Sequence, residues 1–392
     1  MPSLTVGRLP TRLSPFVGRQ RELQDVVAAL ARSRLLTLTG PGGTGKTRLA
    51  LAAAQAVAAD FAGLVCWVEL APVMDPDLVS RVIADALGVP DEPGQDAADG
   101  IAAFVGDQRV LVVLDNCEHL TSAVAEVCER LLGACPALAV LATSRELLGV
   151  EGERSWPVPP LSLPEDGARP VVSVLTASDA VAFFEQRGQL VVPSFRLDED
   201  NAAAVLHVVR RLDGLPLAID LAAAQLRVLS AGQLADRLDD IFTVLVGGAR
   251  SAPPRHQTLR ATLDWSHQLL NADEQAVFRR LGVFAGGFTL PAAERVAAGP
   301  GIDPGRMLEL LTRLADKSLL RVGHSASGAR YRLLSIVREY ALERLAEAGE
   351  QDAARQAQLD FCTDFVAQVA ARIDQAGQDA KSLDHELDRI SD

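Results

Sequence analysis

The sequence is poor in cysteine, lysine and aromatic residues, and it lacks any long hydrophobic run. Its 392 residues include five cysteines without a C-x-x-C pair, which excludes a zinc ribbon and disfavours a disulfide scaffold. No uninterrupted apolar stretch reaches the ~20 residues that a membrane helix needs. Residues 1–12 contain no apolar signal core. We therefore expect a cytoplasmic protein that makes no membrane contact.

Charge is distributed unevenly along the chain. The formal net charge is −13, which argues against general nucleic-acid binding. Residues 251–345 nevertheless carry 13 Lys and Arg against 9 Asp and Glu, so this segment is +4 and the remainder is −17. The only lysines are Lys46, Lys317 and Lys381. Lys46 is informative because arginine supplies nearly all other positive charge.

Strand-like and helical patterns alternate over residues 15–163, which predicts an α/β domain with a parallel sheet covered by helices on both faces. The expected strands are 35–39, 64–70, 110–114, 138–143 and 154–158. The expected helices are 20–31, 50–59, 76–87, 97–105 and 121–132. The proline-rich stretch 157–170 can continue neither element, so we place the first domain boundary there.

Helical patterns dominate the rest of the chain. They predict a helical domain over 170–248 and, after a break at 246–254, a winged-helix domain over 251–345. The expected helices are 179–188, 201–212, 216–228, 231–240, 257–270, 272–282, 289–298 and 304–316. Two short strands, 319–322 and 330–334, complete the winged-helix pattern. Residues 1–14 are expected to be a tail, and 346–392 the start of a helical, TPR-like repeat region.

The segment GPGGTGKT (40–47) matches the phosphate-binding pattern G-x-x-x-x-G-K-[ST] between a predicted strand and a predicted helix. The loop residues Gly42, Gly43, Thr44 and Gly45 would turn backbone N–H groups towards ATP or ADP phosphates. Lys46 would reach the β- and γ-phosphates. Thr47 would ligate Mg²⁺. The alternative is a glycine-rich turn that holds no ligand.

A buried strand that ends in Asp115 has the Walker B pattern, so we expect Asp115 to hold Mg²⁺ together with Thr47. Position 116 is asparagine, and the usual neighbouring catalytic carboxylate is therefore missing. Glu118 could position an attacking water instead, or it could be a solvated glutamate. Arg145, after the strand 138–143, could sense the γ-phosphate, although an arginine at a strand end is commonly solvated.

These segments together resemble STAND-class regulatory ATPases with an NB-ARC module. The matching words are FVGRQREL (16–23), TGPGGTGKTRLA (39–50), LVVLDNCEHL (111–120), LATSRELL (141–148), GLPLAIDLAA (214–223) and YRLLSIVREYA (331–341). They occur in the family's order and span most of the chain. The resemblance is greatest to actinobacterial AfsR-like and large LuxR-type transcriptional regulators.

The resemblance implies specific roles. Val17 and Arg19 would contact the adenine, Arg145 would be the sensor arginine, and Pro216 would close over the adenine. The family often has a histidine in a Met-His-Asp word that touches the ADP β-phosphate. Leu334 stands at that position here, so another group would have to replace it, with Ser335 and Arg338 as candidates, or the resting state would be less tightly locked.

The resulting hypothesis is an ADP/ATP-dependent regulatory switch that hydrolyses ATP slowly. The resemblance further implies self-association in the ATP state and an inducer, either protein or small molecule. The protein would be a weak ATPase, and hydrolysis of ATP would reset the switch.

Two alternatives remain open from the sequence. The first is a DNA-binding winged helix with an appended ATPase, which is less favoured because of the overall negative charge. Its support is a cluster of basic residues: Arg279, Arg280, Arg313, Lys317, Arg321, Arg330 and Arg332. The second is a constitutive metabolic ATPase or kinase, although no second catalytic constellation is visible.

Overall fold

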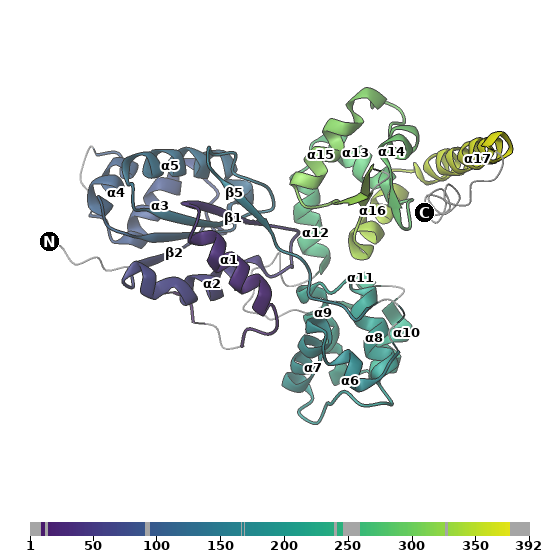
Figure 1. Cartoon of the computed structure of the whole chain (residues 1–392), viewed down its shortest axis with the longest axis horizontal. Helices are drawn as coiled ribbons and strands as arrows, with labels where there is room; N and C mark the ends of the chain where they lie inside the picture. The colour runs from purple at the N-terminus through teal and green to yellow at the C-terminus, as the bar shows by residue number, and fades with distance from the viewer. Residues whose placement is uncertain are drawn as a thin grey trace. The chain divides into compact units, whose positions relative to one another are not determined.

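The computed structural model describes residues 9–11, 15–90, 95–165, 167, 169–238, 241–245, 259–325 and 328–376. The chain divides into two compact units (Figure 1). The sheet unit comprises Met1–Arg210 and Gly214–Leu238, and the winged-helix unit comprises Arg211–Asp213 and Asp239–Asp392. The break expected at 246–254 and the final residues 382–392 lie outside the described residues.

The sheet unit contains a five-stranded parallel sheet in the order β2-β3-β4-β1-β5. The strands are β1 (Leu35–Thr39), β2 (Val65–Glu69), β3 (Leu111–Asp115), β4 (Ala139–Thr143) and β5 (Arg154–Pro157). All five were predicted, β1 to β4 from their apolar runs and β5 as a short strand before the proline-rich stretch. Strand β4 lies between β1 and β3, so the carboxyl end of β4 separates the phosphate-binding loop from the Walker B strand.

Helices cover both faces of this sheet. They are α1 (Gln20–Leu30), α2 (Lys46–Val57), α3 (Val79–Leu87), α4 (Ala97–Val105) and α5 (Thr121–Ala134). One core joins α1 and α2 to alternate strand residues such as Leu36, Leu38 and Val113. The other core joins α3, α4 and α5 to the opposite set, such as Val112 and Val140. Helices therefore cover both faces of the sheet, which explains why β1 to β4 are largely apolar and confirms the α/β fold. Strand β5 is the exception, since it is mostly exposed.

A helical region completes the sheet unit. Its helices are α6 (Val172–Leu175), α7 (Asp179–Val191), α8 (Ala202–Arg211), α9 (Pro216–Ala224) and α10 (Ala231–Arg237). Arg187 of α7 makes a two-point ion pair with Asp220 of α9, and one of its two contacts is 2.9 Å long. Pro216 occupies the first turn of α9, where proline costs no hydrogen bond.

The winged-helix unit has the predicted order of helices followed by a hairpin. Its elements are α11 (Ile241–Val244), α12 (Leu259–Gln268), α13 (Ala272–Leu281), β6 (Gly287–Phe288), α14 (Leu290–Val296), α15 (Met307–Asp316), β7 (Arg321–Ser325), β8 (Gly328–Arg332), α16 (Ser335–Glu347) and α17 (Gln351–Ala376). Its antiparallel sheet has the order β6-β8-β7. Helix α17 packs against α14 and α16. Whether it begins a repeat array stays a prediction.

The predicted hairpin strands, 319–322 and 330–334, were placed incorrectly. The predicted strands relied on leucines that are buried but lie outside the observed strands. Leu319 precedes β7, and Leu333 follows β8. The strands instead extend into the polar residues between them, and the two-residue strand β6 was not predicted. No helix in the described part of the chain is long and apolar enough to cross a membrane.

Candidate nucleotide-binding site

The loop between β1 and α2 has the backbone conformation that an anion nest requires. Gly40, Gly43 and Gly45 have φ angles of 148°, 82° and 89°, a region that glycine enters without the steric cost of a side chain. Thr44 is buried, and its hydroxyl donates to the carbonyl oxygen of Pro41 at 2.9 Å. Helix α2 begins at Lys46, immediately after the loop, so the N–H groups of its first turn adjoin the loop.

Lys46 is the buried cation of this loop. Its Nζ donates to the carbonyl oxygens of Gly40 at 2.6 Å and Pro41 at 3.1 Å. Burial lowers the Lys46 pKa to about 8, while the nearby carboxylates of Glu118 and Asp115 act in the opposite direction. The ammonium is therefore held where solvation is poor, and an anionic ligand would restore its favourable electrostatics.

Asp115 ends β3 as predicted and lies beside the hydroxyl of Thr47. Its Oδ1 accepts from Thr47 Oγ1 at 2.8 Å and from Thr143 Oγ1 at 2.6 Å. Asn116 Nδ2 donates to Asp115 Oδ2 at 3.2 Å. Burial raises the Asp115 pKa, and the hydrogen bonds from Thr143 and Thr47 oppose that effect.

Thr143 was missed in the sequence analysis. It is the last residue of β4, and its hydroxyl also accepts the backbone N–H of Asn116 at 2.9 Å. The signal available was a polar residue at the end of an apolar strand. Its relevance follows from the position of β4 between β1 and β3, which the sequence does not specify.

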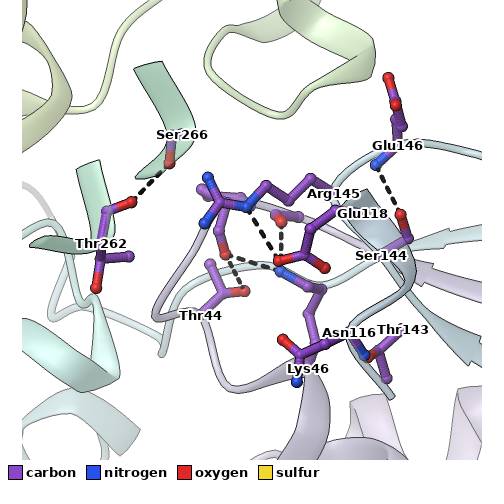
Figure 2. Close-up of polar contacts among 12 residues, drawn as sticks. Thr44, Lys46, Asn116, Glu118, Thr143, Ser144, Arg145, Glu146, Thr262 and Ser266 are labelled. Carbon is purple, nitrogen blue, oxygen red and sulfur yellow. Dashed lines mark hydrogen bonds and ion pairs between the residues drawn. The ribbon is translucent and has the colours of Figure 1, made fainter. Parts of the chain in front are cut away.

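Glu118 and Arg145, predicted separately, form a buried ion pair. Arg145 Nε lies 3.3 Å from Glu118 Oε1, and the two side chains are only 5% and 6% exposed. Figure 2 shows the two side chains pointing towards one another. Glu118 is thus neither a solvated glutamate nor isolated from the sensor candidate, and Arg145 is not a solvated strand-end arginine.

Arg19 and Pro216 both lie next to the phosphate-binding loop. A β-carbon on Gly45 would lie 3.5 Å from Arg19 Nη1 and 3.9 Å from Pro216 Cγ. Arg19 is buried with a φ of 60°, its Nη2 donates to the Pro159 carbonyl at 2.6 Å, and burial lowers its pKa to about 10. Val17 is half-buried in the preceding turn. The adenine contacts of Val17, Arg19 and Pro216 stay predictions.

The GLPL turn (214–217) lies directly against the loop. Leu217 N donates to the Gly43 carbonyl oxygen at 3.2 Å. A β-carbon on Gly43 would lie 2.8 Å from Leu217 Cβ and 3.5 Å from Leu215 Cδ2. The helical region is therefore packed directly against the phosphate-binding loop.

Ser335, the suggested substitute for the missing histidine, begins α16 in the winged-helix unit. Its hydroxyl donates to Asp213 Oδ1 at 3.2 Å, and its backbone N–H donates to Asp213 Oδ2. Arg338 is half-buried on the same helix. A nucleotide contact by either residue stays a prediction.

The residues present fit a Mg²⁺-nucleotide complex. Asp115 and Thr47 place a carboxylate and a hydroxyl oxygen together, which are ligands that Mg²⁺ prefers when phosphates supply the rest. No cluster of three or more His, Cys, Asp and Glu suited to a metal occurs among the residues that the structure describes. A site of the P-loop type needs no such cluster.

Comparisons with known proteins agree with this geometry. Residues 30–150 match the model of an "AAA domain", and residues 270–346 match that of a "Winged helix-turn-helix domain". "Uncharacterized protein Rv0894" of Mycobacterium tuberculosis is 43% identical over 356 residues, which cover 90% of this chain and 87% of that protein. The chain belongs to the Rv0894 family. Within that family it is a P-loop ATPase-fold protein with a C-terminal winged helix-turn-helix domain.

Two further proteins resemble this member of the Rv0894 family. "Putative HTH-type transcriptional regulator Rv0890c" of M. tuberculosis is 46% identical over 325 residues, or 83% of this chain, but the match spans only 35% of that regulator. The Walker-type ATPase PABY2304 of Pyrococcus abyssi is 14% identical with a TM-score of 0.56, over 86% of this chain and 98% of that structure. The latter supports the fold alone.

Proposed function

We propose that this chain is an ADP/ATP-controlled regulatory switch of the STAND class, with the nucleotide-binding arrangement of an NB-ARC module. The observation that carries the proposal is the contact of the GLPL turn with the phosphate-binding loop through Leu217 N and the Gly43 carbonyl. A change in that loop would reach the helical region through packed backbone atoms, without a long relay.

Different residues of the site would bind the phosphates and the Mg²⁺ ion. Lys46 and the backbone N–H groups would hold the phosphates, while Thr47 and Asp115 would hold Mg²⁺. When bound, Mg²⁺ would neutralise phosphate charge. Thr143 would keep the Asp115 carboxylate oriented through its 2.6 Å hydrogen bond, so we count it as a positioning residue.

Arg145 would distinguish ATP from ADP. Its guanidinium is paired with Glu118, and a γ-phosphate would compete with that carboxylate for it. Moving a two-state protein from mostly one form to mostly the other needs about 5.5 kcal/mol of differential affinity. A charge-assisted contact made in only one state would supply roughly 1.5–3 kcal/mol of this. An inducer or self-association would supply the rest.

Hydrolysis would be slow and would reset the switch. Asn116 replaces the usual carboxylate after Asp115, and Glu118 is engaged with Arg145. A general base must be available to the attacking water. Rapid turnover without a partner would instead indicate the constitutive ATPase.

The test is calorimetric titration of ADP and ATP with Mg²⁺ into the wild type and Leu217→Ala. We expect unequal affinities for the two nucleotides, and a ratio that changes in Leu217→Ala. Leu190→Ala is the matched control, because Leu190 is 63% exposed on α7 of the same region. Equal affinities in all three proteins would reject the switch while leaving a nucleotide-binding protein.

A second proposed function is direct contact with DNA, which the sequence analysis treated as the less favoured alternative. Two observations favour it: the match to a winged helix-turn-helix model over residues 270–346, and the arginines of the β7–β8 hairpin. Three of the seven basic residues named in the sequence analysis are already paired with carboxylates, however. Arg279 and Arg280 pair with Glu350, and Lys317 pairs with Glu274.

A further inference from the structure

An open cavity of about 370 Å³ lies at the edge of the parallel sheet opposite the phosphate-binding loop. Its lining comes from the end of α1 and the turn into β1 (30–34), Phe61 after α2, Arg109 before β3, and residues 136–139 at the start of β4. Strands β1, β3 and β4 each have five residues, a length of about 16 Å. That length separates the cavity from the nucleotide site. We call it the amino-edge cavity.

The amino-edge cavity is lined by cations and not by carboxylates. Arg32, Arg34 and Arg109 all belong to the lining, and no Asp or Glu does among the residues that the structure describes. The carboxylates closest in sequence, Asp60 and Asp107, are exposed and lie outside the lining. In a chain of net charge −13, a cavity with three arginines and no acid favours an anionic ligand.

Two of the arginines also bind the carboxyl ends of helices. Arg34 Nη2 donates to the carbonyl oxygens of Leu132 at 2.6 Å and Cys135 at 2.7 Å, at the end of α5. Arg32 Nε donates to the Ala28 carbonyl oxygen in the last turn of α1 at 3.1 Å. A helix carboxyl end carries a charge of about −0.5. Even if three such ends are subtracted, for α1, α5 and the α2 segment, the lining keeps about +1.5.

Arg109 is held in place without using its hydrogen-bond donors. Its Cζ lies over the ring of Phe61, 4.9 Å from the centroid, and the ring is buried. A cation–π contact consumes no N–H group. Neither Arg109 nor Arg32 pairs with a carboxylate in the described part of the chain. Both guanidinium groups can therefore donate to an anion, while Pro136 and Ala137 supply apolar contact area.

The amino-edge cavity and the nucleotide site are built on the same elements. Strands β1, β3 and β4 begin at the cavity and end at the phosphate-binding loop, Asp115 and Thr143. Helix α2 begins at Lys46, and the 3-10 turn that follows it ends at Phe61. Its 12 residues span about 18 Å. Packed strands and helices of this kind are able to transmit a change between two sites.

We propose that the amino-edge cavity binds a small organic anion, a carboxylate or phosphate on a compact apolar group, and that this anion is an effector of the nucleotide switch. The inference rests on the proposed function and names the chemistry of its inducer. The cavity volume of about 370 Å³ lies at the low end of the roughly 300–1,000 Å³ of small-molecule sites, so the ligand is a small molecule.

The test uses fluorine NMR titration of 4-fluorobenzoate and of 4-fluorophenyl phosphate into the full chain saturated with ADP and Mg²⁺. Bound ADP keeps the probes out of the phosphate-binding loop. We expect saturable binding of at least one anion and none of the uncharged 4-fluorobenzamide. Arg109→Gln and Arg32→Gln should each weaken binding about tenfold or more, the loss of one charge-assisted hydrogen bond, with an unchanged Tm because both side chains are exposed.

Arg227→Gln is the matched control for Arg32→Gln. Arg227 is exposed, and its Nε also donates to a helix carbonyl oxygen, that of Ala224 at 3.3 Å. It does not line the amino-edge cavity. This variant should bind the anions as the wild type does.

The effector role has its own measurement, the ratio of ADP to ATP affinity with and without saturating anion. Coupling between two sites is reciprocal, so the ratio should change in the wild type and stay constant in Arg109→Gln. An unchanged ratio in the wild type would overturn the effector role.

The remaining outcomes concern the cavity and the switch separately. Absence of saturable binding of both anions, or equal binding of 4-fluorobenzamide, would overturn the anion site. Equal affinity in Arg109→Gln, Arg32→Gln and the wild type would place the anion elsewhere and overturn the cavity as its site. Equal affinities for ADP and ATP without any anion would reject the proposed switch, whereas arginine-dependent anion binding would still support the cavity.

Discussion

Nucleotide affinity should fall as pH rises from 7 to 9, because Lys46 must be protonated to bind phosphate. Burial lowers the pKa of this lysine to about 8 from its ordinary value of 10.5. With that pKa, about 90% of the nucleotide-free protein carries the charge at pH 7 and about 10% at pH 9. ADP phosphates are ionised throughout this range, since a terminal phosphate titrates near pH ~6. The expected loss of ADP affinity is therefore about tenfold, or about 1.4 kcal/mol.

The assay is calorimetric titration of ADP at pH 7, 8 and 9 with the wild type and Lys46→Arg. An arginine stays charged over this range, so the variant should bind more weakly but with no dependence on pH. A flat profile for the wild type would mean that Lys46 titrates near its ordinary pKa, and it would contradict a lysine whose pKa is lowered by burial.

The lowered pKa of Lys46 also affects the stability of the nucleotide-free protein. Stability should rise with pH, whereas nucleotide affinity should fall. Between pH 8 and 10.5 the unfolded chain binds a proton at Lys46 that the folded chain does not. The free energy of unfolding of the nucleotide-free protein should therefore rise over this window. The increase in the free energy of unfolding is about 3 kcal/mol at most, which is the cost of keeping a charged Lys46 buried. Urea denaturation should show this rise in the wild type and not in Lys46→Met.

Three further predictions concern single substitutions. Glu350→Gln should lower the free energy of unfolding by roughly 1–3 kcal/mol at pH 7. Two arginines of α13 hydrogen bond to Glu350 and lower its pKa to about 2 from 4.5, so the difference from wild type should be full above pH 4.5 and vanish towards pH 2 in urea titrations. Gly43→Ala should weaken ADP binding in calorimetry more than Gly152→Ala. Both have positive φ, but only the first places a β-carbon against Leu217, at 2.8 Å, and nothing lies within 4 Å at Gly152; equal effects would deny the contact. Asp115→Asn should remove the Mg²⁺-dependent part of ATP affinity, roughly 1.5–3 kcal/mol, and unchanged Mg²⁺ dependence in calorimetry with and without EDTA would refute its role.

Much of the sheet unit was predictable because its central strands β1, β3 and β4 are buried on both faces. Such strands are continuous apolar runs, and the loop 40–47 follows the first of them. The hairpin of the winged-helix unit was less predictable, because β7 is polar and exposed whereas the buried leucines lie just outside it. A prediction from apolar residues therefore placed the two strands at 319–322 and 330–334 instead of at β7 and β8.

The sequence predicted most residues of the site, but not the ion pair and hydrogen bonds that they form with one another. Glu118 and Arg145 are 27 positions apart and meet only because β3 and β4 are adjacent. Thr143 reaches Asp115 for the same reason. Strand order depends on long-range packing, which no local pattern along the chain specifies.

The proposed switch requires the GLPL turn and α9 to respond to the nucleotide that the phosphate-binding loop holds. Hydrogen–deuterium exchange of residues 214–224, compared between ADP and a non-hydrolysable ATP analogue, measures this directly. We predict different protection in this segment and unchanged protection in α3 and α4. Identical exchange of residues 214–224 in both nucleotide states would contradict the proposed switch.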